Sequence, residues 1–549
     1  MRIVVVGGVA GGMSAAARAR RLDENAEIIV FERGEHPSFA NCGLPYYVSG
    51  EITERSDLLV QTPESLREAL DIDVRIQHDV IAVDPQARTV QVRNAAGVET
   101  VSYDALVLSP GASAIRPPLP GLDSPRVQTL RTVGDAVRMR ESVDEGATRA
   151  VVLGAGFIGL EAAEGLRMQG LAVDVVELAP HVLPPLETEI AARISAELTA
   201  MGITVHEGIG AASVETGADE DVVVLADGTR IPADVIVLSV GVRPDTEVFV
   251  AAGIDNDRGA LIVDEHGRTN LDGIWAVGDA VISTDRVTGV RRPVALAGPA
   301  NRAGRLVADH IVAPETARPI PQPVGTAIVR VGSLTAALTG ANRSALDAAG
   351  IDYRTIHLHA DNHAGYFPGA VQMSLLLHLR SSDGLILGAQ GVGPDGVDKR
   401  IDVFATAIAN QMTGPELIDL DLAYAPPYGS AKDPVNLAGM IAENVLDGEL
   451  KLWYAEQVDE PGYLLLDTRS QEEYDEGHLP GALLVPHVQV RERLDEIREA
   501  AAGRPIRVYC ASGKRSYLAY RILRQSGLTA ANLSGGMLTL RAARGDLFA

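Results

Sequence analysis

Hydrophobic and polar positions divide the start of the chain into short apolar runs separated by a helical stretch. The first run, Arg2–Val6, leads through a glycine turn into the Ala-rich stretch Met13–Leu22. A second run, Glu27–Phe31, ends in Glu32. Continuous apolar runs of this length predict parallel strands that are buried on both faces, and the stretch between them predicts a helix. The chain is therefore predicted to begin with a strand–turn–helix–strand unit.

The same unit recurs further along the chain. The apolar strand Ala150–Leu153 precedes a second glycine turn and a helical stretch, and the next strand ends at Glu177. Two such units in one chain predict two nucleotide-binding folds, with one inserted into the other.

The rest of the chain continues the alternation of strands and helices. Strands are predicted at Met373–Leu379 and Ile386–Val392, followed by a helix at Val397–Met412. The stretch Gly439–Leu452 is more polar and helical, which predicts a linker. A new α/β unit begins at Tyr463, and its strands are predicted at Leu464–Leu466 and Arg507–Tyr509.

The composition is that of an acidic globular protein. Of the 549 residues, 46% are hydrophobic and 22% are charged, which excludes collagen-like, disordered and coiled-coil chains. The formal net charge of −25 argues against nucleic acid or an anionic membrane as the main partner. The uncharged stretch Ile3–Ala17 is too short to span a membrane, and its glycines argue against a signal peptide. We therefore expect a cytoplasmic protein of about three to four domains.

The chain has only two cysteines, Cys42 and Cys510, which lie far apart in the sequence. This excludes a disulfide framework, a cysteine zinc site and any C-x-x-C redox pair, and no metal site is predicted. Any thiol chemistry must therefore use each cysteine without a neighbouring sulfur.

The second glycine turn carries a full dinucleotide fingerprint. The run Gly154–Gly159 has the form G-x-G-x-x-G directly after a strand, and Glu177 ends the next strand in position to bind a ribose hydroxyl. A carboxylate there repels the 2′-phosphate of NADPH, and no arginine follows it closely, so NADH is favoured, although use of NADPH stays possible. The predicted NAD-binding residues are Gly154, Gly156, Phe157, Ile158, Gly159, Glu177 and Gly241.

The first glycine turn is by itself weaker evidence for a dinucleotide site, because Val9 replaces the second glycine of the fingerprint. It gains support from Glu32, 20 residues beyond Gly12, and from the segment Thr269–Asp279, which ends in V-G-D. Here the chain resembles the flavoprotein disulfide reductases with two dinucleotide folds, in which this aspartate holds the flavin ribityl chain. The resemblance implies an FAD site formed by Gly7, Gly8, Ala10, Gly11, Gly12, Glu32, Arg33, Asn41, Val80, Ser109, Gly111, Asp279 and Ala297.

The resemblance also implies the domain organisation and an α/β fold class. Two Rossmann-like domains of the glutathione-reductase type would bind FAD and NAD, followed by an α+β dimerisation domain and a C-terminal α/β rhodanese domain. The expected boundaries are 1–115 and 245–320 for FAD, 116–244 for NAD, 321–445 for dimerisation, 446–460 for a linker and 461–549 for the rhodanese.

Cys42 lies in the run Ser38–Tyr47, shortly after the acid expected at the flavin ribose. A free cysteine is most often a small buried core residue. However, S-F-x-x-C at this position resembles coenzyme A disulfide reductases and their single-cysteine relatives, in which the thiolate faces the flavin. Such a role requires a lowered thiol pKa, which we expect a helix N-terminus and the flavin to supply.

A single redox cysteine can hold oxygen as a sulfenate, a substrate thiol as a mixed disulfide, or sulfane sulfur as a persulfide. NADH peroxidases and oxidases of this family carry a histidine in the first glycine turn, where this chain has Ala10. That departure argues against peroxide chemistry.

Several residues point to coenzyme A. Arg18 and Arg21 supply local positive charge for its phosphates, and a solvated helix face is the alternative interpretation. The resemblance assigns coenzyme A contacts to Ser14, Arg18, Arg21, Ser38, Asn41 and Lys432. It also assigns catalytic roles to Tyr366 and Tyr424, the first reaching the partner subunit's cysteine. These assignments imply a homodimer whose active sites are completed in trans.

The last part of the chain resembles a rhodanese domain, through Leu466–Arg469, Glu473–Ala482 and the loop after the strand Arg507–Tyr509. That loop is formed by Cys510, Ala511, Ser512, Gly513, Lys514 and Arg515. Successive N–H groups that open onto a helix N-terminus make an anion cradle, which suits a persulfide on Cys510. We expect Asp467 and Arg469 to hold the scaffold of the loop rather than to react.

Together these features predict an FAD-dependent enzyme that uses NADH to reduce coenzyme A persulfide, polysulfide or coenzyme A disulfide at Cys42. Sulfane sulfur would come from Cys510, carried by coenzyme A. Three alternatives stay open: a coenzyme A disulfide reductase whose rhodanese acts separately, an NADH oxidase or peroxidase, and a redox-sensing or sulfur-carrier protein.

Overall fold

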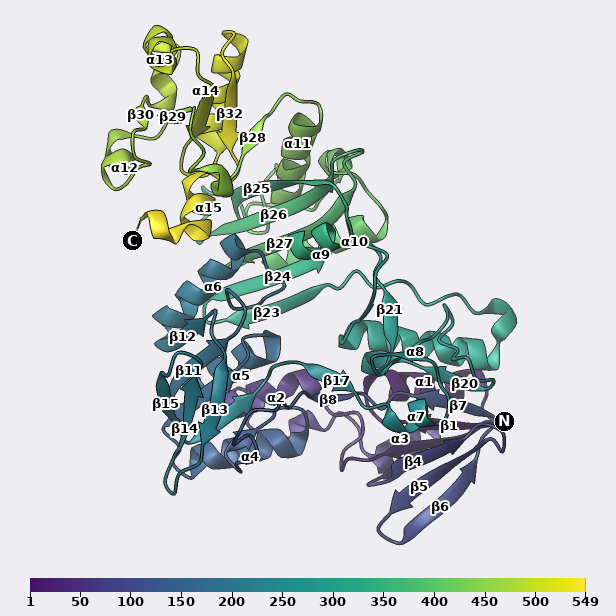
Figure 1. Cartoon of the computed structure of the whole chain (residues 1–549). Helices are drawn as coiled ribbons and strands as arrows, with labels where there is room; N and C mark the ends of the chain where they lie inside the picture. The colour runs from purple at the N-terminus through teal and green to yellow at the C-terminus, as the bar shows by residue number, and fades with distance from the viewer. Residues whose placement is uncertain (549) are drawn as a thin grey trace. The chain divides into compact units, whose positions relative to one another are not determined.

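The computed structural model describes residues 1–548 in two compact units (Figure 1). The first unit comprises Met1–Pro180 and Thr199–Gly325, and the second comprises His181–Leu198 and the chain from Thr326 onward. Each unit is described by itself. Among the residues that the structure describes, no helix is long and apolar enough to cross a membrane.

The first unit contains a parallel sheet with strand order β20-β7-β1-β2-β3, as predicted for the start of the chain. Alternate residues of β1 (Arg2–Val6) enter two cores: Ile3 and Val5 pack with helices α1, α3 and α8, while Val4 and Val6 pack with a three-stranded meander. This burial on both faces explains the unbroken apolar run. The other elements are β2 (Glu27–Glu32), β3 (Asp73–Ile76), β7 (Ala105–Leu108), β20 (Ile274–Ala276), α1 (Ala10–Leu22), α3 (Pro63–Leu70), α8 (Ala297–Val312) and the meander β4 (Asp79–Asp84), β5 (Thr89–Asn94) and β6 (Gly97–Ser102).

A second parallel sheet in this unit has the strand order β12-β11-β10-β16-β9. The chain passes from the first sheet to the second through β8 (Ala112–Ala114) and returns through β17 (Val242–Pro244), and these two strands pair antiparallel. The predicted insertion of one fold into the other is thus confirmed. The elements are β9 (Val127–Gln128), β10 (Arg149–Leu153), β11 (Ala172–Glu177), β12 (Ile203–Glu207), β16 (Val235–Leu238), α4 (Val133–Asp144), α5 (Phe157–Met168) and the meander β13 (Ala211–Glu215), β14 (Asp221–Leu225) and β15 (Arg230–Ala233).

Shorter elements connect these sheets. They are η1 (Asn41–Gly43), α2 (Leu44–Ser49), η2 (Arg55–Leu58), α7 (Glu247–Ala251), β18 (Asn256–Asp257), β19 (Ala260–Leu261), η3 (Gly278–Ala280), β21 (Ile282–Thr284), β22 (Arg291–Pro293) and η4 (Pro314–Thr316).

The second unit contains an antiparallel sheet with strand order β23-β24-β27-β26-β25. Helix α10 packs on β24 and β27, and α11 packs beside β25. The elements are β23 (Ala327–Val331), β24 (Leu334–Gly340), β25 (Tyr353–Asp361), β26 (Gln372–Arg380), β27 (Ile386–Gly393), α6 (Thr188–Ala200), α9 (Arg343–Ala348), α10 (Val397–Ala409), η5 (Pro415–Asp419) and α11 (Pro434–Leu446). The two predicted strands are confirmed, and α10 ends three residues before the predicted Met412.

The fourth sheet is parallel, with strand order β28-β32-β31-β29-β30. Its elements are β28 (Leu452–Trp453), β29 (Leu464–Asp467), β30 (Leu483–Leu484), β31 (Ile506–Tyr509), β32 (Ala530–Leu533), α12 (Gln471–Asp475), α13 (Leu494–Ala501), α14 (Lys514–Gln525), α15 (Gly536–Ala543) and the short helices η6 (Ala455–Gln457), η7 (His487–Gln489) and η8 (Gly545–Leu547).

The expected linker at 446–460 is wrong. Helix α11 buries Val435, Ala438 and Ala442, so the stretch before residue 446 is a packed helix. Beyond it, β28 joins the fourth sheet, and the buried Trp453 donates a hydrogen bond to the Val508 carbonyl at 3.2 Å. The polar residues that suggested a linker are the outer faces of these packed elements.

Candidate functional site

The first glycine turn brings the backbones of β1 and α1 together so closely that side chains are excluded. Gly7 has φ +94, and a Cβ atom there would lie 2.0 Å from the Ser109 carbonyl oxygen. A Cβ atom at Gly12 would lie 2.0 Å from the Gly7 carbonyl oxygen. Helix α1 starts within the turn, at Ala10 rather than the predicted Met13, and the N–H groups of its first turn lack partners within the helix. This is the cradle that a dinucleotide pyrophosphate needs.

Glu32 is fixed beside this turn. One carboxylate oxygen accepts the Gly8 N–H at 2.7 Å, and the other accepts the Gly34 N–H at 2.7 Å. The carboxylate is thus held at the end of β2, where the sequence predicts contact with a ribose.

The second turn repeats this arrangement. Gly154 has φ +98, and a Cβ atom there would lie 2.4 Å from the Ser239 carbonyl oxygen. Glu177 accepts the Ala155 N–H at 2.7 Å and the Ala179 N–H at 2.8 Å. A Cβ atom at Gly156 would meet nothing within 4 Å, which leaves open space at the helix N-terminus. Both turns therefore fit a dinucleotide. Phe157, Ile158 and Gly159 begin α5, and Gly241 follows β16 with φ +109.

Several of the other residues predicted to bind FAD lie at the carboxyl ends of β1, β7 and β20. A Cβ atom at Gly11 would lie 2.9 Å from the Ser109 Oγ atom, and one at Gly278 would lie 3.6 Å from the same atom. Asp279 pairs with Arg131 at 3.0 Å, a partner that the sequence reasoning missed. The buried Asn41 Oδ1 atom has no hydrogen-bond partner among the described residues, so it is free to accept a donor from a ligand. Of the remaining residues, Gly111 lies next to the Arg131 side chain, Ala297 begins α8, Val80 is buried in the core and Arg33 pairs with Asp245.

Cys42 is exposed and lies in η1, directly before α2. Partial desolvation raises the pKa of its thiol, and the Glu161 carboxylate raises this pKa further. The chain's own groups therefore raise the pKa of this thiol, and a lowering by the bound flavin stays a prediction. Glu161 lies on α5 and accepts a hydrogen bond from the Tyr46 hydroxyl at 3.2 Å. The sequence gives no signal for this neighbour, because it comes from a helix of the other dinucleotide fold, more than 100 residues later.

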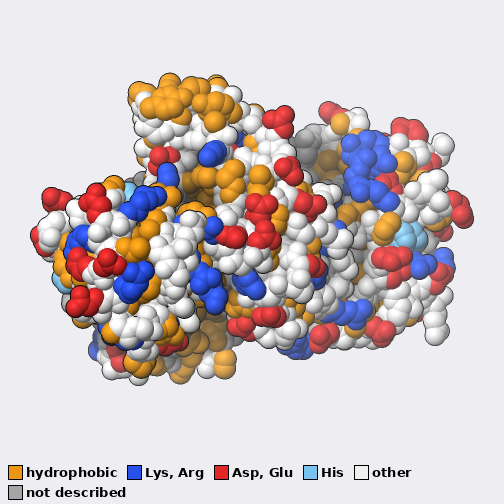
Figure 2. All heavy atoms as spheres, turned by 90° about the horizontal axis from the view of Figure 1, so that it is seen from above, with side chains coloured by type: hydrophobic (Ala, Val, Ile, Leu, Met, Phe, Trp, Pro, Cys, Tyr) orange, Lys and Arg blue, Asp and Glu red, His pale blue; other side chains and the backbone are white. Residues whose placement is uncertain are grey.

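The predicted coenzyme A residues of the first unit follow α1 and the first glycine turn. The Ser14 hydroxyl donates to Asn301 at 2.6 Å, and Arg18 pairs with Asp309 at 2.5 Å, both partners lying on α8. Arg21 donates to the Ala17 carbonyl of its own helix, and the Ser38 N–H donates to the Gly8 carbonyl at 2.8 Å. Over the face shown in Figure 2, acidic side chains are interspersed with small groups of basic ones. At α1, Asp309 offsets part of the positive charge that Arg18 would offer to an anionic ligand.

Tyr366 and Tyr424 meet in the second unit. Their hydroxyl oxygens lie 3.1 Å apart, and the side chains are 77% and 49% exposed. The hydrogen bond between the two hydroxyls is the largest cause that raises the pKa of Tyr366.

Lys432 is exposed directly before the N-terminus of α11. The next residue, Asp433, accepts the Val435 N–H at 3.0 Å as the cap of the helix and pairs with the buried Arg400 at 2.8 Å. This cap fixes the backbone from which the Lys432 side chain projects.

The Cys510 loop forms the predicted cradle. The Cys510 Sγ atom accepts hydrogen bonds from the Gly513 N–H and the Ser516 hydroxyl, each at 3.2 Å. The loop, with Ala511 and Ser512, leads into α14 at Lys514, and Gly513 caps that helix with φ +90. Cys510 is fully buried. The sequence reasoning did not assign Ser516 a role, although it lies only six residues after the cysteine.

Arg515 is held beside this cradle by Glu473, which the sequence reasoning also missed. The two side chains form a bidentate pair at 2.6 and 2.7 Å. The hydrogen bond from Arg515 lowers the pKa of Glu473 to about 2. Asp467 and Arg469 form a buried pair with each other at 2.6 Å, consistent with a scaffold role.

Sequence models of three families match the chain. The model of pyridine nucleotide-disulphide oxidoreductases matches residues 1–304, that of the dimerisation domain of these enzymes matches residues 326–434, and that of the rhodanese-like domain matches residues 451–543. The last match begins before the predicted 461 and includes β28.

Individual proteins resemble the chain over most or all of its length. The coenzyme A disulfide reductase of Staphylococcus haemolyticus is 35% identical over 448 residues, which covers 81% of this chain and 100% of that protein. The structure of reduced Bacillus anthracis CoADR-RHD superposes with a TM-score of 0.97 at 39% identity, covering 100% of this chain and 98% of that one. An NAD-dependent persulfide reductase from A. fulgidus gives a TM-score of 0.92 at 36% identity, covering 98% and 100%.

Proposed function

The chain belongs to the pyridine nucleotide-disulphide oxidoreductases, as a flavin-dependent member with a rhodanese domain, and we propose that it uses NADH to reduce coenzyme A persulfide. The observation that carries the proposal is the Cys510 cradle, in which an N–H and a hydroxyl each lie 3.2 Å from the sulfur. Hydrogen-bond donors in this arrangement stabilise a sulfur anion. A sulfur-accepting loop on the same chain as a single-cysteine reductase favours persulfide over disulfide as the substrate.

Cys510 performs the first part of the reaction. Its thiolate attacks the sulfane sulfur of a donor such as thiosulfate, a new S–S bond forms and the donor leaves as its anion, here sulfite. The coenzyme A thiolate then attacks the outer sulfur of the Cys510 persulfide. This forms coenzyme A persulfide and returns the Cys510 thiolate.

Cys42 performs the second part. Its thiolate attacks the sulfur bound to coenzyme A, hydrosulfide leaves and a mixed disulfide forms; attack on the outer sulfur would instead leave a Cys42 persulfide. Two electrons from NADH restore the thiolate, so NADH, one proton and coenzyme A persulfide give NAD⁺, coenzyme A and hydrogen sulfide. FAD, when bound, supplies the two-electron chemistry that links NADH to a thiol. The residues that hold it are the first glycine turn, Glu32, Ser109 and Asp279, while the second glycine turn and Glu177 hold NADH.

A homodimer completes this site. We assign coenzyme A contacts to Ser14, Arg18 and Ser38 of one protomer and to Lys432 of its partner. The hydrogen-bonded hydroxyls of Tyr366 and Tyr424 supply a proton to the departing coenzyme A thiolate.

Anaerobic initial rates of NADH oxidation test the proposal. The kcat/KM for coenzyme A persulfide should exceed that for coenzyme A disulfide at least tenfold, about 1.4 kcal/mol of transition-state stabilisation. Cys42→Ser should abolish both reactions. Cys510→Ser should keep reduction of preformed coenzyme A persulfide but lose the thiosulfate-driven reaction. Full activity of Cys42→Ser would overturn the mechanism.

A coenzyme A disulfide reductase is the second candidate. Similarity to the Staphylococcus haemolyticus enzyme favours it, because that protein is matched over its whole length. A tenfold preference for the disulfide would establish this function and leave the rhodanese as a separate activity. Ala10 argues against an NADH oxidase or peroxidase, which oxygen consumption would reveal. Rapid NADH turnover with any sulfur substrate would exclude a pure sensor or sulfur carrier.

A further inference from the structure

A short turn in the second unit lies between strand β25 and the Cys510 loop. The turn, Ser534–Gly536, follows β32 directly, and its two glycines have φ +71 and φ +64. A Cβ atom at Gly535 would lie 2.8 Å from the His357 Cβ atom on β25. A Cβ atom at Gly536 would lie 2.5 Å from the Cys510 carbonyl oxygen. One side of the turn therefore contacts the dimerisation sheet, and the other contacts the active loop of the rhodanese.

The turn and the helix after it hold the loop through its backbone. The Met537 N–H donates to the Cys510 carbonyl at 2.8 Å, and the Leu538 N–H donates to the Ala511 carbonyl at 2.9 Å. These two carbonyls belong to the same loop whose Gly513 N–H points at the Cys510 sulfur. A displacement of the turn would therefore move the donors that surround the sulfur.

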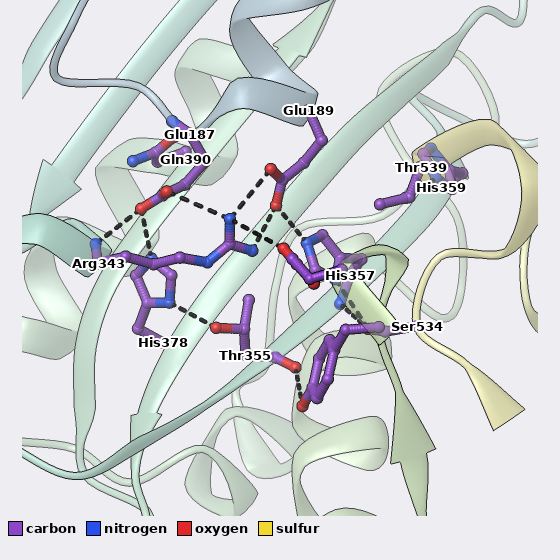
Figure 3. Close-up of polar contacts among 12 residues, drawn as sticks. Glu187, Glu189, Arg343, Thr355, His357, His359, His378, Gln390, Ser534 and Thr539 are labelled. Carbon is purple, nitrogen blue, oxygen red and sulfur yellow. Dashed lines mark hydrogen bonds and ion pairs between the residues drawn. The ribbon is translucent and has the colours of Figure 1, made fainter. Parts of the chain in front are cut away.

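His357 fixes the turn from the side of β25. Its Nδ1 atom lies 2.8 Å from the Ser534 hydroxyl oxygen, and its backbone N–H donates to the same oxygen at 3.2 Å. Its Nε2 atom lies 2.7 Å from the Glu189 carboxylate on α6 (Figure 3). All three side chains are buried, so each polar atom needs its partner.

Glu189 sets the orientation of the imidazole. Burial alone raises the pKa of Glu189, but hydrogen bonds and charges from His357 and Arg343 outweigh burial and bring this pKa well below its usual range. An ionised carboxylate only accepts hydrogen bonds, so the His357 Nε2 atom carries a proton and donates it. The Nδ1 atom on the other side of the ring is thereby aimed at the Ser534 hydroxyl oxygen, which also accepts the His357 backbone N–H.

We propose that His357 is a positioning residue for sulfur transfer at Cys510: through its bond to Ser534, strand β25 fixes the Ser534–Gly536 turn and with it the donors of the cradle. This inference rests on the proposed reaction of Cys510. Misplacement of a reacting group by about 1 Å can cost up to about 100-fold in rate, so a residue outside the loop can govern turnover.

Two conservative variants separate the bonds of His357 in the FAD-loaded full chain. Asparagine places its amide near the position of Nδ1 and keeps a partner for Ser534, whereas glutamine places its amide near Nε2 and keeps a partner for Glu189. In a thiosulfate-to-cyanide sulfurtransferase assay, His357→Gln should lower kcat about 10-fold with little change in KM. His357→Asn should retain most of the activity. Ser534→Ala removes the same hydrogen bond by deleting the Ser534 hydroxyl. It should lower kcat as much as His357→Gln does.

Tyr454→Phe is the matched control. It removes the hydrogen bond from the Tyr454 hydroxyl to the Thr355 carbonyl at 2.9 Å, which joins the rhodanese domain to the same strand without contacting the Cys510 loop. This variant should keep its sulfurtransferase activity. NADH-dependent reduction of coenzyme A disulfide shows in the same samples that each variant is folded.

The outcomes distinguish this inference from the proposed function. If the wild-type enzyme transfers no sulfur, the proposed function fails, and this inference fails with it. If the wild type transfers sulfur and His357→Gln and Ser534→Ala both match it, only the inference fails. Equal losses in His357→Asn and His357→Gln would show general packing and would also overturn the role of the Ser534 bond.

Discussion

Glu473 holds the guanidinium group of Arg515 in the Cys510 loop. Both of its oxygens accept hydrogen bonds from Arg515, which lower its pKa from 4.5 to about 2. A carboxyl group whose pKa is lower in the folded state stabilises the protein above its ordinary pKa, and this contribution is lost as the pH falls toward the folded value. The stabilisation is therefore present at neutral pH and is lost as the pH falls from about 4.5 to about 2.

We predict that Glu473→Gln removes this pH dependence. Between about pH 7 and about pH 3, the urea midpoint of the wild type should fall further than that of the variant. The variant should also lose sulfurtransferase activity about 10-fold, because Arg515 is released from its bidentate partner. Glu476→Gln, at an exposed carboxylate near the end of α12, is the control and should behave as the wild type. Parallel pH curves for wild type and Glu473→Gln would contradict the prediction.

At the residue scale, local motifs single out the residues expected to touch a ligand, but they do not reveal the neighbours that act on those residues. Cys42, Cys510 and the two glycine turns each lie within a local pattern, whereas Glu161 acts on Cys42 from helix α5 of the second dinucleotide fold. The rise that Glu161 causes in the pKa of Cys42 therefore could not be foreseen from the sequence. Spatial neighbours from distant elements leave no local pattern, and the same holds for the contact between His357 and Ser534.

At the scale of elements, the parallel strands could be predicted because they are buried on both faces. The boundary between the dimerisation domain and the rhodanese domain was harder to predict, because the elements there are amphipathic. Strand β1 has the predicted bounds because every apolar residue in it enters one of two cores. Helix α11 and strand β28 were read as a linker, because their outer faces are polar and β28 pairs with a strand almost 80 residues later. Such pairings of short edge strands depend on the completed sheet.

The start of α11 carries a second prediction at this scale. Asp433 caps the helix and neutralises Arg400, and the two side chains are 4% and 2% exposed. Asp433→Ala leaves a buried guanidinium unpaired, so the local opening free energy of α11 should fall by about 3–5 kcal/mol in amide hydrogen exchange. Thr62→Ala, which removes the cap of α3 without exposing a buried charge, should cost that helix only about 1 kcal/mol. Equal effects in the two helices would mean that the Arg400 pair contributes little.

At the scale of the whole molecule, the two nucleotide-binding folds share the same local arrangement of a glycine turn and an acidic residue. In each, a glycine turn excludes side chains, and an acid at the end of the second strand accepts two backbone N–H groups, at Glu32 and at Glu177. The third and fourth sheets add what these folds lack: exposed tyrosine hydroxyls and a buried sulfur in a cradle of donors. The proposed reaction would therefore use groups from all four sheets.

Heterodimers test whether those groups act within one protomer or between two. If Tyr366 and Tyr424 complete the Cys42 site of the partner, a heterodimer of Cys42→Ser with a Tyr366→Phe/Tyr424→Phe protomer has one intact site. Isolated through two different affinity tags, it should reach about half of the wild-type rate of NADH-dependent coenzyme A persulfide reduction. A heterodimer of a Cys42→Ser protomer with a wild-type protomer has one intact site under either arrangement. Its rate is therefore the reference for half of the wild-type rate. If the tyrosines act within their own protomer, both sites of the test heterodimer are defective, and its rate will not exceed the mean of its two parent homodimers. A fully active tyrosine double variant would instead show that neither hydroxyl serves the reaction.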